Sequence, residues 1–298
     1  MARTDTLGNF LTDVAAAIRE KKGTTDAILA SNFDTEIASI ETGGGSTTVE
    51  KGLVINSFDE NGYATDVSIV GMTEIPQYYL YYASYISDNH KAWLGNIGGN
   101  LHLPNDLTKI NASAFGYCTG LALTELPDTI REIWDNAFSY CTNLALTKLP
   151  SNLYYLGGRA FYGCTNLALT ELPSGLKSMG FNVFQNCKNI TVKEIPKGIT
   201  NLNGGEFRGC TSITEMTCLG VIGQIGTYVF NGCSNLEKLV IPNNTTVPTL
   251  QGTNAFTGTK IASGTGYIYV PDDLVESFKT ATNWSTYADQ IKGMSELV

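Results

Sequence analysis

Seven cysteines and two histidines are the side chains of this 298-residue chain that could support thiol or metal chemistry. Six of the cysteines recur at one fixed interval, at Cys118, Cys141, Cys164, Cys187, Cys210 and Cys233. Such a set could form disulfides, but the CxxC spacing typical of zinc sites does not occur. The two histidines, His90 and His102, are too few for a histidine metal site or a catalytic triad. The regular spacing therefore points to the structural unit that carries the cysteines.

A phenylalanine lies three positions before each of these cysteines and defines the same 23-residue repeat. The six phenylalanines are Phe115, Phe138, Phe161, Phe184, Phe207 and Phe230. A seventh, weaker copy has Phe256, with Thr259 in the place of the cysteine. Proline follows the same spacing at Pro104, Pro127, Pro150, Pro173, Pro196 and Pro242, and the copy without it has Cys218 in the aliphatic place and Leu219 in the proline place. A fixed period of this length predicts a solenoid.

Three further sets of aliphatic residues repeat in phase with the phenylalanines. They begin at Leu107, Ile110 and Leu121 and recur in each following copy. Stacked coils would turn each set into an inward column, with the cysteines as small apolar side chains in a tight turn. Equivalent cysteines about 4.8 Å apart would be close enough to bridge, but their parallel Cβ directions disfavour a disulfide. We therefore expect the cysteines to pack, with disulfides or metal binding as the alternatives.

Polar positions repeat as well. Asparagine recurs at Asn143, Asn166, Asn189 and Asn235, beside a column of threonine and serine. These side chains are expected to bond turn backbone along the stack. They replace charged surface, which explains why only 16% of residues are charged.

The composition excludes several functions. The chain carries a net charge of −9 and has a pI near 4.8, so nucleic acid and anionic membranes are not expected partners. It has no apolar run long enough for a membrane span. It also lacks the GxSxG, HExxH and phosphate-loop motifs. We predict a protein that is not an enzyme, with no catalytic or metal-binding residues and no cofactor.

The phased pattern ELPxxIxxIxxxAFxxCTNL resembles the BspA-like leucine-rich repeats of bacterial surface and phage proteins, over roughly residues 100–260. The resemblance implies a mainly β fold, a solenoid of about seven 23-residue coils. The segment from about residue 271 resembles the end of such arrays. Its expected helix would begin near Pro271 and close the stack with Leu274, Val275 and Phe278.

The first 50 residues differ in pattern from the repeats. Residues 1–42 predict a small helical module for assembly or attachment, with an apolar seam of Leu7, Leu11, Val14 and Ile18. A Gly/Ser/Thr linker follows at residues 43–50, and the solenoid is expected over 51–298, opened by a β-hairpin within 52–70. The segment before the linker resembles short leader modules of tail and baseplate proteins from phages that infect Gram-positive bacteria. The alternative is a helical hairpin that docks on the solenoid.

Candidate binding residues are aromatics that the repeat does not dictate: Tyr117, Trp134, Tyr140, Tyr154, Tyr155 and Tyr162. The aromatic stretch 78–93 is either core or a second surface. The leading hypothesis is a virion protein of a phage tail, baseplate or fibre that recognises a host surface glycan or protein. It would be assembled in the host cytoplasm, because the N-terminus lacks a signal-peptide pattern. Other virion proteins and copies of itself are its expected partners. A bacterial surface adhesin and a purely structural virion connector are the alternatives.

Overall fold

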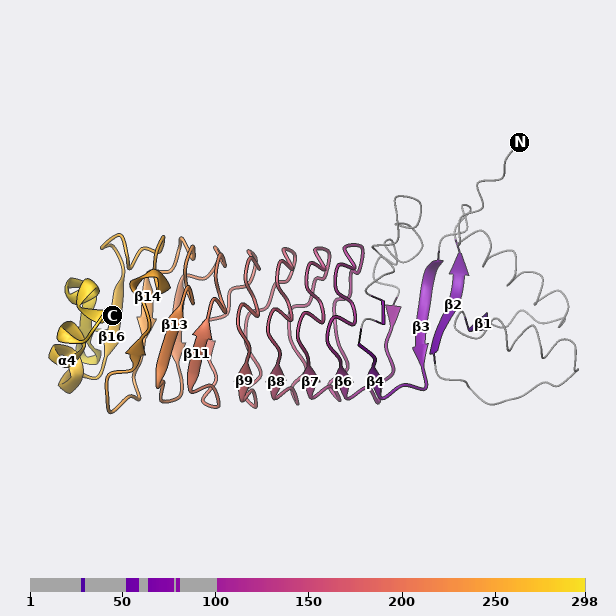
Figure 1. Cartoon of the computed structure of the whole chain (residues 1–298), viewed down its shortest axis with the longest axis horizontal. Helices are drawn as coiled ribbons and strands as arrows, with labels where there is room; N and C mark the ends of the chain where they lie inside the picture. The colour runs from indigo at the N-terminus through magenta and orange to yellow at the C-terminus, as the bar shows by residue number, and fades with distance from the viewer. Residues whose placement is uncertain (1–27, 30–51, 59–63, 78, 81–100, 298) are drawn as a thin grey trace, which may run out of the picture.

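The computed structural model describes residues 28–29, 52–58, 64–77, 79–80 and 101–297. Its coils stack side by side into one elongated solenoid, with a β-hairpin toward one end and a short helix at the other (Figure 1). The predicted assembly helix with Leu7, Leu11, Val14 and Ile18 lies outside the described residues, as does the linker. Of the aromatic stretch 78–93, only residues 79–80 are described; Tyr79 packs half-buried against the core.

One short strand in each coil forms the first strand column. In the N-terminal half these strands form a parallel sheet of β4 (Glu74–Ile75), β6 (Lys109–Ile110), β7 (Glu132–Ile133), β8 (Tyr155–Leu156) and β9 (Ser178–Met179). In the C-terminal half they form a second sheet of β11 (Asn201–Gly204), β13 (Gln224–Thr227) and β15 (Thr249–Leu250). From β6 to β9, and again from β11 to β13, neighbouring strands pair at an offset equal to the sequence period. The sequence period is thus one turn of the solenoid.

A second strand column forms mainly in the C-terminal half. It comprises the parallel strands β10 (Glu194–Ile195), β12 (Glu215–Cys218), β14 (Lys238–Val240), β16 (Tyr267–Val270) and β17 (Ile291–Gly293). In the three coils before β10, the corresponding segments read TELP, TKLP and TELP and are not strands. Two of the coils that do pair have two β-branched residues in this segment, Val240 with Ile241 and Ile268 with Val270, and such residues favour extended ladders.

The N-terminal end of the solenoid is a hairpin. β2 (Gly52–Phe58) pairs antiparallel with β3 (Ala64–Val70), with register shifts near Ser57. β3 in turn pairs in parallel with β5 (Leu101–His102), so the hairpin continues the stack. β1 (Ile28–Leu29) adds to the outer side of β2, so a segment within the module predicted as helical contributes a strand.

The core is a stack of repeated side chains. The seven phenylalanines from Phe115 to Phe256 are fully buried, and neighbouring ring centroids lie 5.1 to 5.8 Å apart. The aliphatic columns are buried beside them. These observations confirm the predicted leucine-rich repeat solenoid, including the seventh coil at Phe256.

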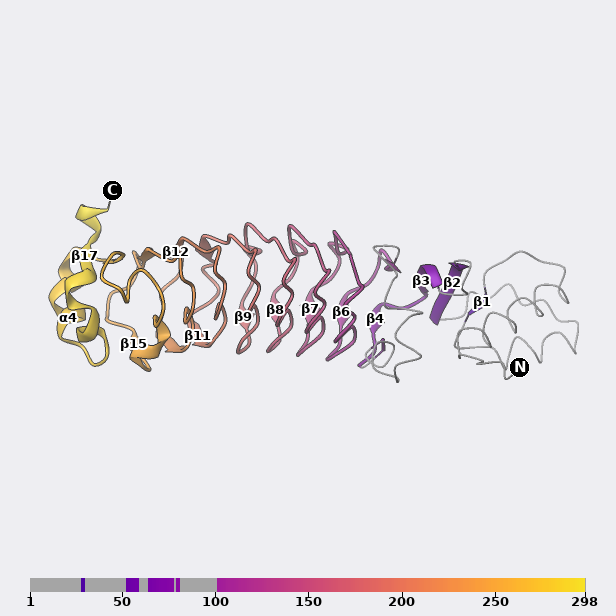
Figure 2. The same cartoon turned by 90° about the horizontal axis from the view of Figure 1, so that it is seen from above.

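The C-terminal end is closed by short helices (Figures 1 and 2). They are η4 (Asp272–Leu274), α4 (Val275–Thr280), η5 (Trp284–Gln290) and η6 (Met294–Glu296), while η3 (Thr253–Ala255) lies in the last coil. Phe278 and Trp284 are buried, and Trp284 and Tyr287 pack against Phe256. Trp284 Nε1 also donates to the carbonyl of Pro248 at 2.7 Å. The open end of the phenylalanine column is thereby covered, as terminal repeats require.

Candidate functional site

The cysteines are packing residues in this fold. All seven are free and buried, which overturns the disulfide alternative. Each thiol from Cys141 to Cys233 in the repeat column donates to the carbonyl of the phenylalanine in the preceding coil, at 2.9 to 3.1 Å. Burial raises the pKa of Cys118 and Cys233 to about 12, so neither supplies a thiolate nucleophile. The hydrogen-bond role was missed by sequence reasoning, which treated cysteine only as a small apolar side chain.

Other reactive side chains are also dispersed. In the part of the chain that the structure describes, no three His, Cys, Asp or Glu side chains gather as metal ligands. His102 lies 3.1 Å from Asp66 across the β3–β5 pair, and His90 is outside the described residues. No helix among the described residues is long and apolar enough to cross a membrane.

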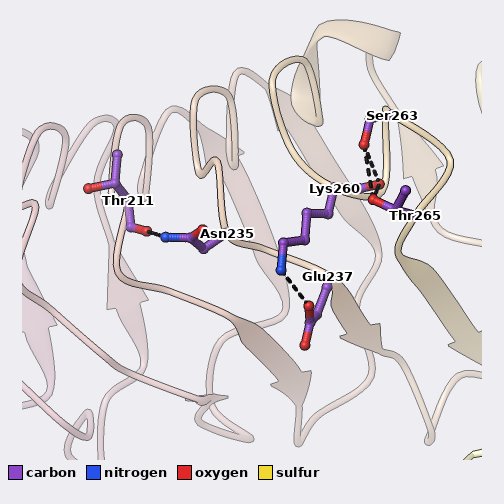
Figure 3. A network of polar contacts seen from close by, with 6 residues as sticks. All are labelled: Thr211, Asn235, Glu237, Lys260, Ser263 and Thr265. Carbon is purple, nitrogen blue, oxygen red and sulfur yellow. Dashed lines mark hydrogen bonds and ion pairs between the residues drawn. The ribbon is translucent and has the colours of Figure 1, made fainter.

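The predicted polar columns form only in part. Asn235 Nδ2 donates to the carbonyl of Thr211 at 2.8 Å (Figure 3). Thr142 and Thr165 donate weakly, at 3.4 Å, to the threonine carbonyl one coil earlier. Near Asn235, Lys260 Nζ contacts Glu237 at 2.7 Å. These bonds join neighbouring coils at the surface and contribute to holding the stack in register.

The six predicted aromatic residues separate into two clusters. Tyr117, Tyr140 and Tyr162 come from the turns around the phenylalanine column and form the turn cluster. Trp134, Tyr154 and Tyr155 come from the first strand column, in or next to β7 and β8, and form the strand cluster. Tyr117, Trp134, Tyr140 and Tyr154 are exposed, at 36 to 39% of their surface, while Tyr155 and Tyr162 are half-buried.

The turn cluster is built on strained backbone. Tyr117 and Tyr140 have φ values of 63° and 59°. In the other coils this position is glycine or asparagine, the residues that adopt the left-handed region most readily. A bulky residue there costs about 1–3 kcal/mol. The backbone therefore does not favour tyrosine here, which suggests that the side chain itself is used.

Stacking orders the rings of the turn cluster. The rings of Tyr117 and Tyr140 stack at 4.9 Å, and that of Tyr162 meets Tyr140 edge-on at 5.0 Å. Gly163 leaves room for this arrangement, because a Cβ there would lie 3.0 Å from Tyr140 Cδ1. A side-chain hydrogen bond with Tyr162 raises the pKa of the Tyr140 hydroxyl.

Glu132 organises the strand cluster. Its carboxylate accepts a hydrogen bond from Trp134 Nε1 at 2.8 Å and another from the Tyr154 hydroxyl. These two bonds, with Lys109 nearby, lower the pKa of Glu132, and the same carboxylate raises the pKa of Tyr154. Lys109 Nζ lies 4.7 Å from the centre of the Trp134 ring, and the tilted Tyr155 ring lies 5.3 Å from it.

The two clusters have one geometric property in common. Lys109 lies over the Trp134 ring, and Tyr117 and Tyr140 cover each other. One face of the Trp134 ring and one face each of the Tyr117 and Tyr140 rings are therefore covered, and the Trp134 indole N–H and the Tyr154 hydroxyl are bonded to Glu132. Sugar rings stack on open aromatic faces, whereas protein interfaces use the large apolar area and polar tips of Tyr and Trp.

A surface groove was missed by sequence reasoning. It has a volume of about 820 Å³ and crosses successive coils beside Leu149, Leu172, Pro173 and Pro196. Within residues 101–297, the backbone groups of 147–149 and 170–172 make no backbone–backbone hydrogen bonds. Its lining carries three acidic and three basic side chains, so its charge favours neither an anionic nor a cationic ligand. The only sequence signal that could have indicated the groove is the repeated TELP and TKLP segment, which ends in proline.

Comparison with known proteins supplies a family. The model of the BspA type leucine rich repeat region matches residues 86–203 and 132–263, which together make more than half of the chain. No curated protein matches the sequence.

Solved structures of leucine-rich repeat proteins are similar at low identity. A leucine-rich repeat protein of T. pallidum is 22% identical, with 68% of this chain and 84% of that one covered and a TM-score of 0.43. A leucine rich cell surface protein of Faecalibacterium prausnitzii A2-165 is 18% identical, with 74% and 68% covered and a TM-score of 0.33. A leucine-rich repeat protein of Bacteroides ovatus ATCC 8483 is 14% identical, with 84% and 100% covered and a TM-score of 0.22.

Proposed function

Because this chain belongs to the BspA-type leucine-rich repeat family, we propose that it is a non-enzymatic binding protein that recognises a protein partner. The turn and strand clusters form the contact surface. The observation that carries the proposal is the pair Tyr117 and Tyr140, exposed aromatics on backbone that favours glycine. Strain of this kind is retained at functional positions when the surrounding fold supports it.

The rigidity of the solenoid supports this role. The aromatic rings project from coils that are locked by the buried phenylalanine column and the first strand column. Side chains held in place lose little freedom on binding, so more of the contact energy is available as affinity. Trp and Tyr are also the residues that most often dominate the energetics of protein interfaces.

We further propose that the protein is carried by a phage virion, as a tail, baseplate or fibre component attached through residues 1–42. The support is the resemblance of that segment to phage leader modules. The bacterial surface adhesin is an equally compatible carrier of the same binding surface. Mass spectrometry of purified virions distinguishes the two, because peptides of this chain should be found in virions for the first and in cell-surface fractions for the second.

Binding of the full chain to bacterial cells tests the recognition proposal. We expect binding to intact cells, and loss of it after the cells are treated with protease. The double variant Trp134→Ala with Tyr155→Ala should lose most of the binding. The control is Tyr267→Ala, which removes an equally exposed tyrosine from β16 in the other strand column.

Three results would change the conclusion. Binding that survives protease and is found again on a glycan array would mean a carbohydrate ligand. Binding that is unchanged in the double variant would exclude the strand cluster from the contact surface. Absence of binding by the wild-type chain would favour a structural connector.

A further inference from the structure

Among the described residues, Glu206 is the one charged residue in a buried apolar column of the solenoid. The residue before each phenylalanine of the stack is alanine or valine in the other coils, including Val183 and Val229 on either side. Glu206 has this position in the fifth coil and is fully buried. A buried carboxyl needs strong hydrogen bonds to compensate for its lost hydration, so its partners indicate its role.

The partners of Glu206 are backbone amides of its own coil. Asn203 N–H donates to Glu206 Oε1 at 2.5 Å, and Gly204 N–H donates to both carboxylate oxygens at 3.0 Å. Burial raises the pKa of Glu206 to about 7, against the lowering effect of these amides. The causes of this shift are burial and the backbone amides of Gly204, Glu206 and Asn203, and no charged side chain is among them.

In the preceding coils, the backbone amides equivalent to Asn203 N–H have a different partner. There the equivalent N–H groups of Trp134, Gly157 and Gly180 donate to the strand one coil earlier, at 2.8 to 2.9 Å. The corresponding acceptor for Asn203 N–H would be the carbonyl of Met179. That carbonyl instead accepts a long bond of 3.5 Å from the side chain of Asn203.

The bond from Asn203 N–H to Glu206 in place of Met179 O coincides with a break in the first strand column. The N-terminal sheet ends at β9 and the next sheet begins at β11, although the sequence period continues unchanged through this point. Other bonds still join the two coils, such as Asn182 N–H to Gly204 O and Phe184 N–H to Glu206 O. Two backbone bonds are missing from the strand pairing: the one from Asn203 N–H, and the one that Lys177 O would accept as its equivalents Arg131 O and Tyr154 O do.

We propose that the Glu206 carboxyl is a proton-operated switch for strand pairing between the two halves of the solenoid. As a carboxylate it holds the amides of Asn203 and Gly204 and keeps β11 unpaired from β9. When a solvent proton binds one carboxyl oxygen, the group becomes a weaker acceptor and releases Asn203 N–H. This amide then donates to Met179 O, as its equivalents do in the preceding coils, and one of the two missing ladder bonds forms.

Nuclear magnetic resonance of the full chain tests the switch through the backbone amide signal of Asn203. Between pH 5 and pH 8 this signal should move with a midpoint near 7, and a hydrogen bond from Asn203 N–H to Met179 O should be found only on the acidic side. In Glu206→Gln the signal should stay fixed over this range. The control Glu215→Gln removes a surface carboxylate that is paired with Lys193 and Lys238, and should leave the titration unchanged.

Two outcomes would overturn the proposal. One is an Asn203 signal that does not titrate, or that titrates with the midpoint of an ordinary glutamate. The other is an Asn203 amide that remains bonded to Glu206 at pH 5. The wild-type titration decides the question by itself if Glu206→Gln does not fold.

Discussion

The buried carboxyl of Glu206 makes the stability of the solenoid depend on pH in an unusual direction. Most carboxyl groups in folded proteins have a lowered pKa and stabilise the fold as the pH rises. The pKa of Glu206 is instead raised from 4.5 to about 7. The folded state therefore binds a proton more tightly than the unfolded chain, and this contribution to stability is complete below pH 4.5 and is lost as the pH rises to 7.

The size of the effect follows from the shift. A difference of about 2.5 pH units at about 1.4 kcal/mol per unit corresponds to about 3 kcal/mol. We expect the free energy of unfolding of the wild type to fall by about this amount between pH 4.5 and pH 7, relative to Glu206→Gln. Other titrating groups are the same in both proteins, so their contributions cancel in the difference.

Urea unfolding, followed by the fluorescence of the buried Trp284, measures this difference at several pH values. The wild type and Glu206→Gln should differ in slope between pH 4.5 and 7 and run parallel above and below that window. Parallel curves throughout would refute the raised pKa. A wild type that gains stability over the window relative to the variant would reverse the sign and show that the carboxylate is the favoured buried form.

Three further predictions concern the core. Phe161→Ala should destabilise the fold by about 3–5 kcal/mol in urea unfolding, because the ring is fully buried between two stacked phenylalanines, whereas Phe181→Ala at a 59% exposed position should change it little; equal effects would contradict the stack. The seven buried thiols should react with a thiol reagent only as the chain unfolds, and fast reaction of the native protein, measured by absorbance, would count against the raised pKa values. Gly226→Ala should lower the melting temperature clearly, because its Cβ would clash with the backbone oxygen of Asn203, while Gly175→Ala meets nothing closer than 4.0 Å; similar melting temperatures would mean that the coils separate easily.

Much of the fold was predictable because the repeat amplifies a weak signal. One coil taken alone has an ambiguous pattern, but seven coils in phase identify the phenylalanine, cysteine and aliphatic columns as core. The aromatic candidates were found by the same logic, as positions that the period does not dictate. Which of them contact one another could not be predicted, because Glu132 and Lys109 belong to different coils from Tyr154 and Trp134 respectively.

The groove and the proposed Glu206 switch could not be predicted from the sequence either, because both depend on contacts between different coils. Glu206 is visible in the sequence as an exception to the alanine and valine column. Its effect depends on which amide its carboxylate reaches, and that amide would otherwise pair with the strand of the preceding coil, at Met179. The groove likewise depends on backbone groups that fail to pair between coils.

The sequence by itself determined the period, the inward columns, the solenoid and the absence of recognisable catalytic motifs, since these follow from residue types at fixed spacing. Only the tertiary structure decided that the cysteine thiols bond to phenylalanine carbonyls, that the aromatic rings form two clusters, and that the first strand column breaks between β9 and β11, beside Glu206. The physical reason is that the period fixes which residues are neighbours between coils. The direction of each hydrogen bond and ring within those neighbours depends on backbone conformation, which the spacing alone does not specify.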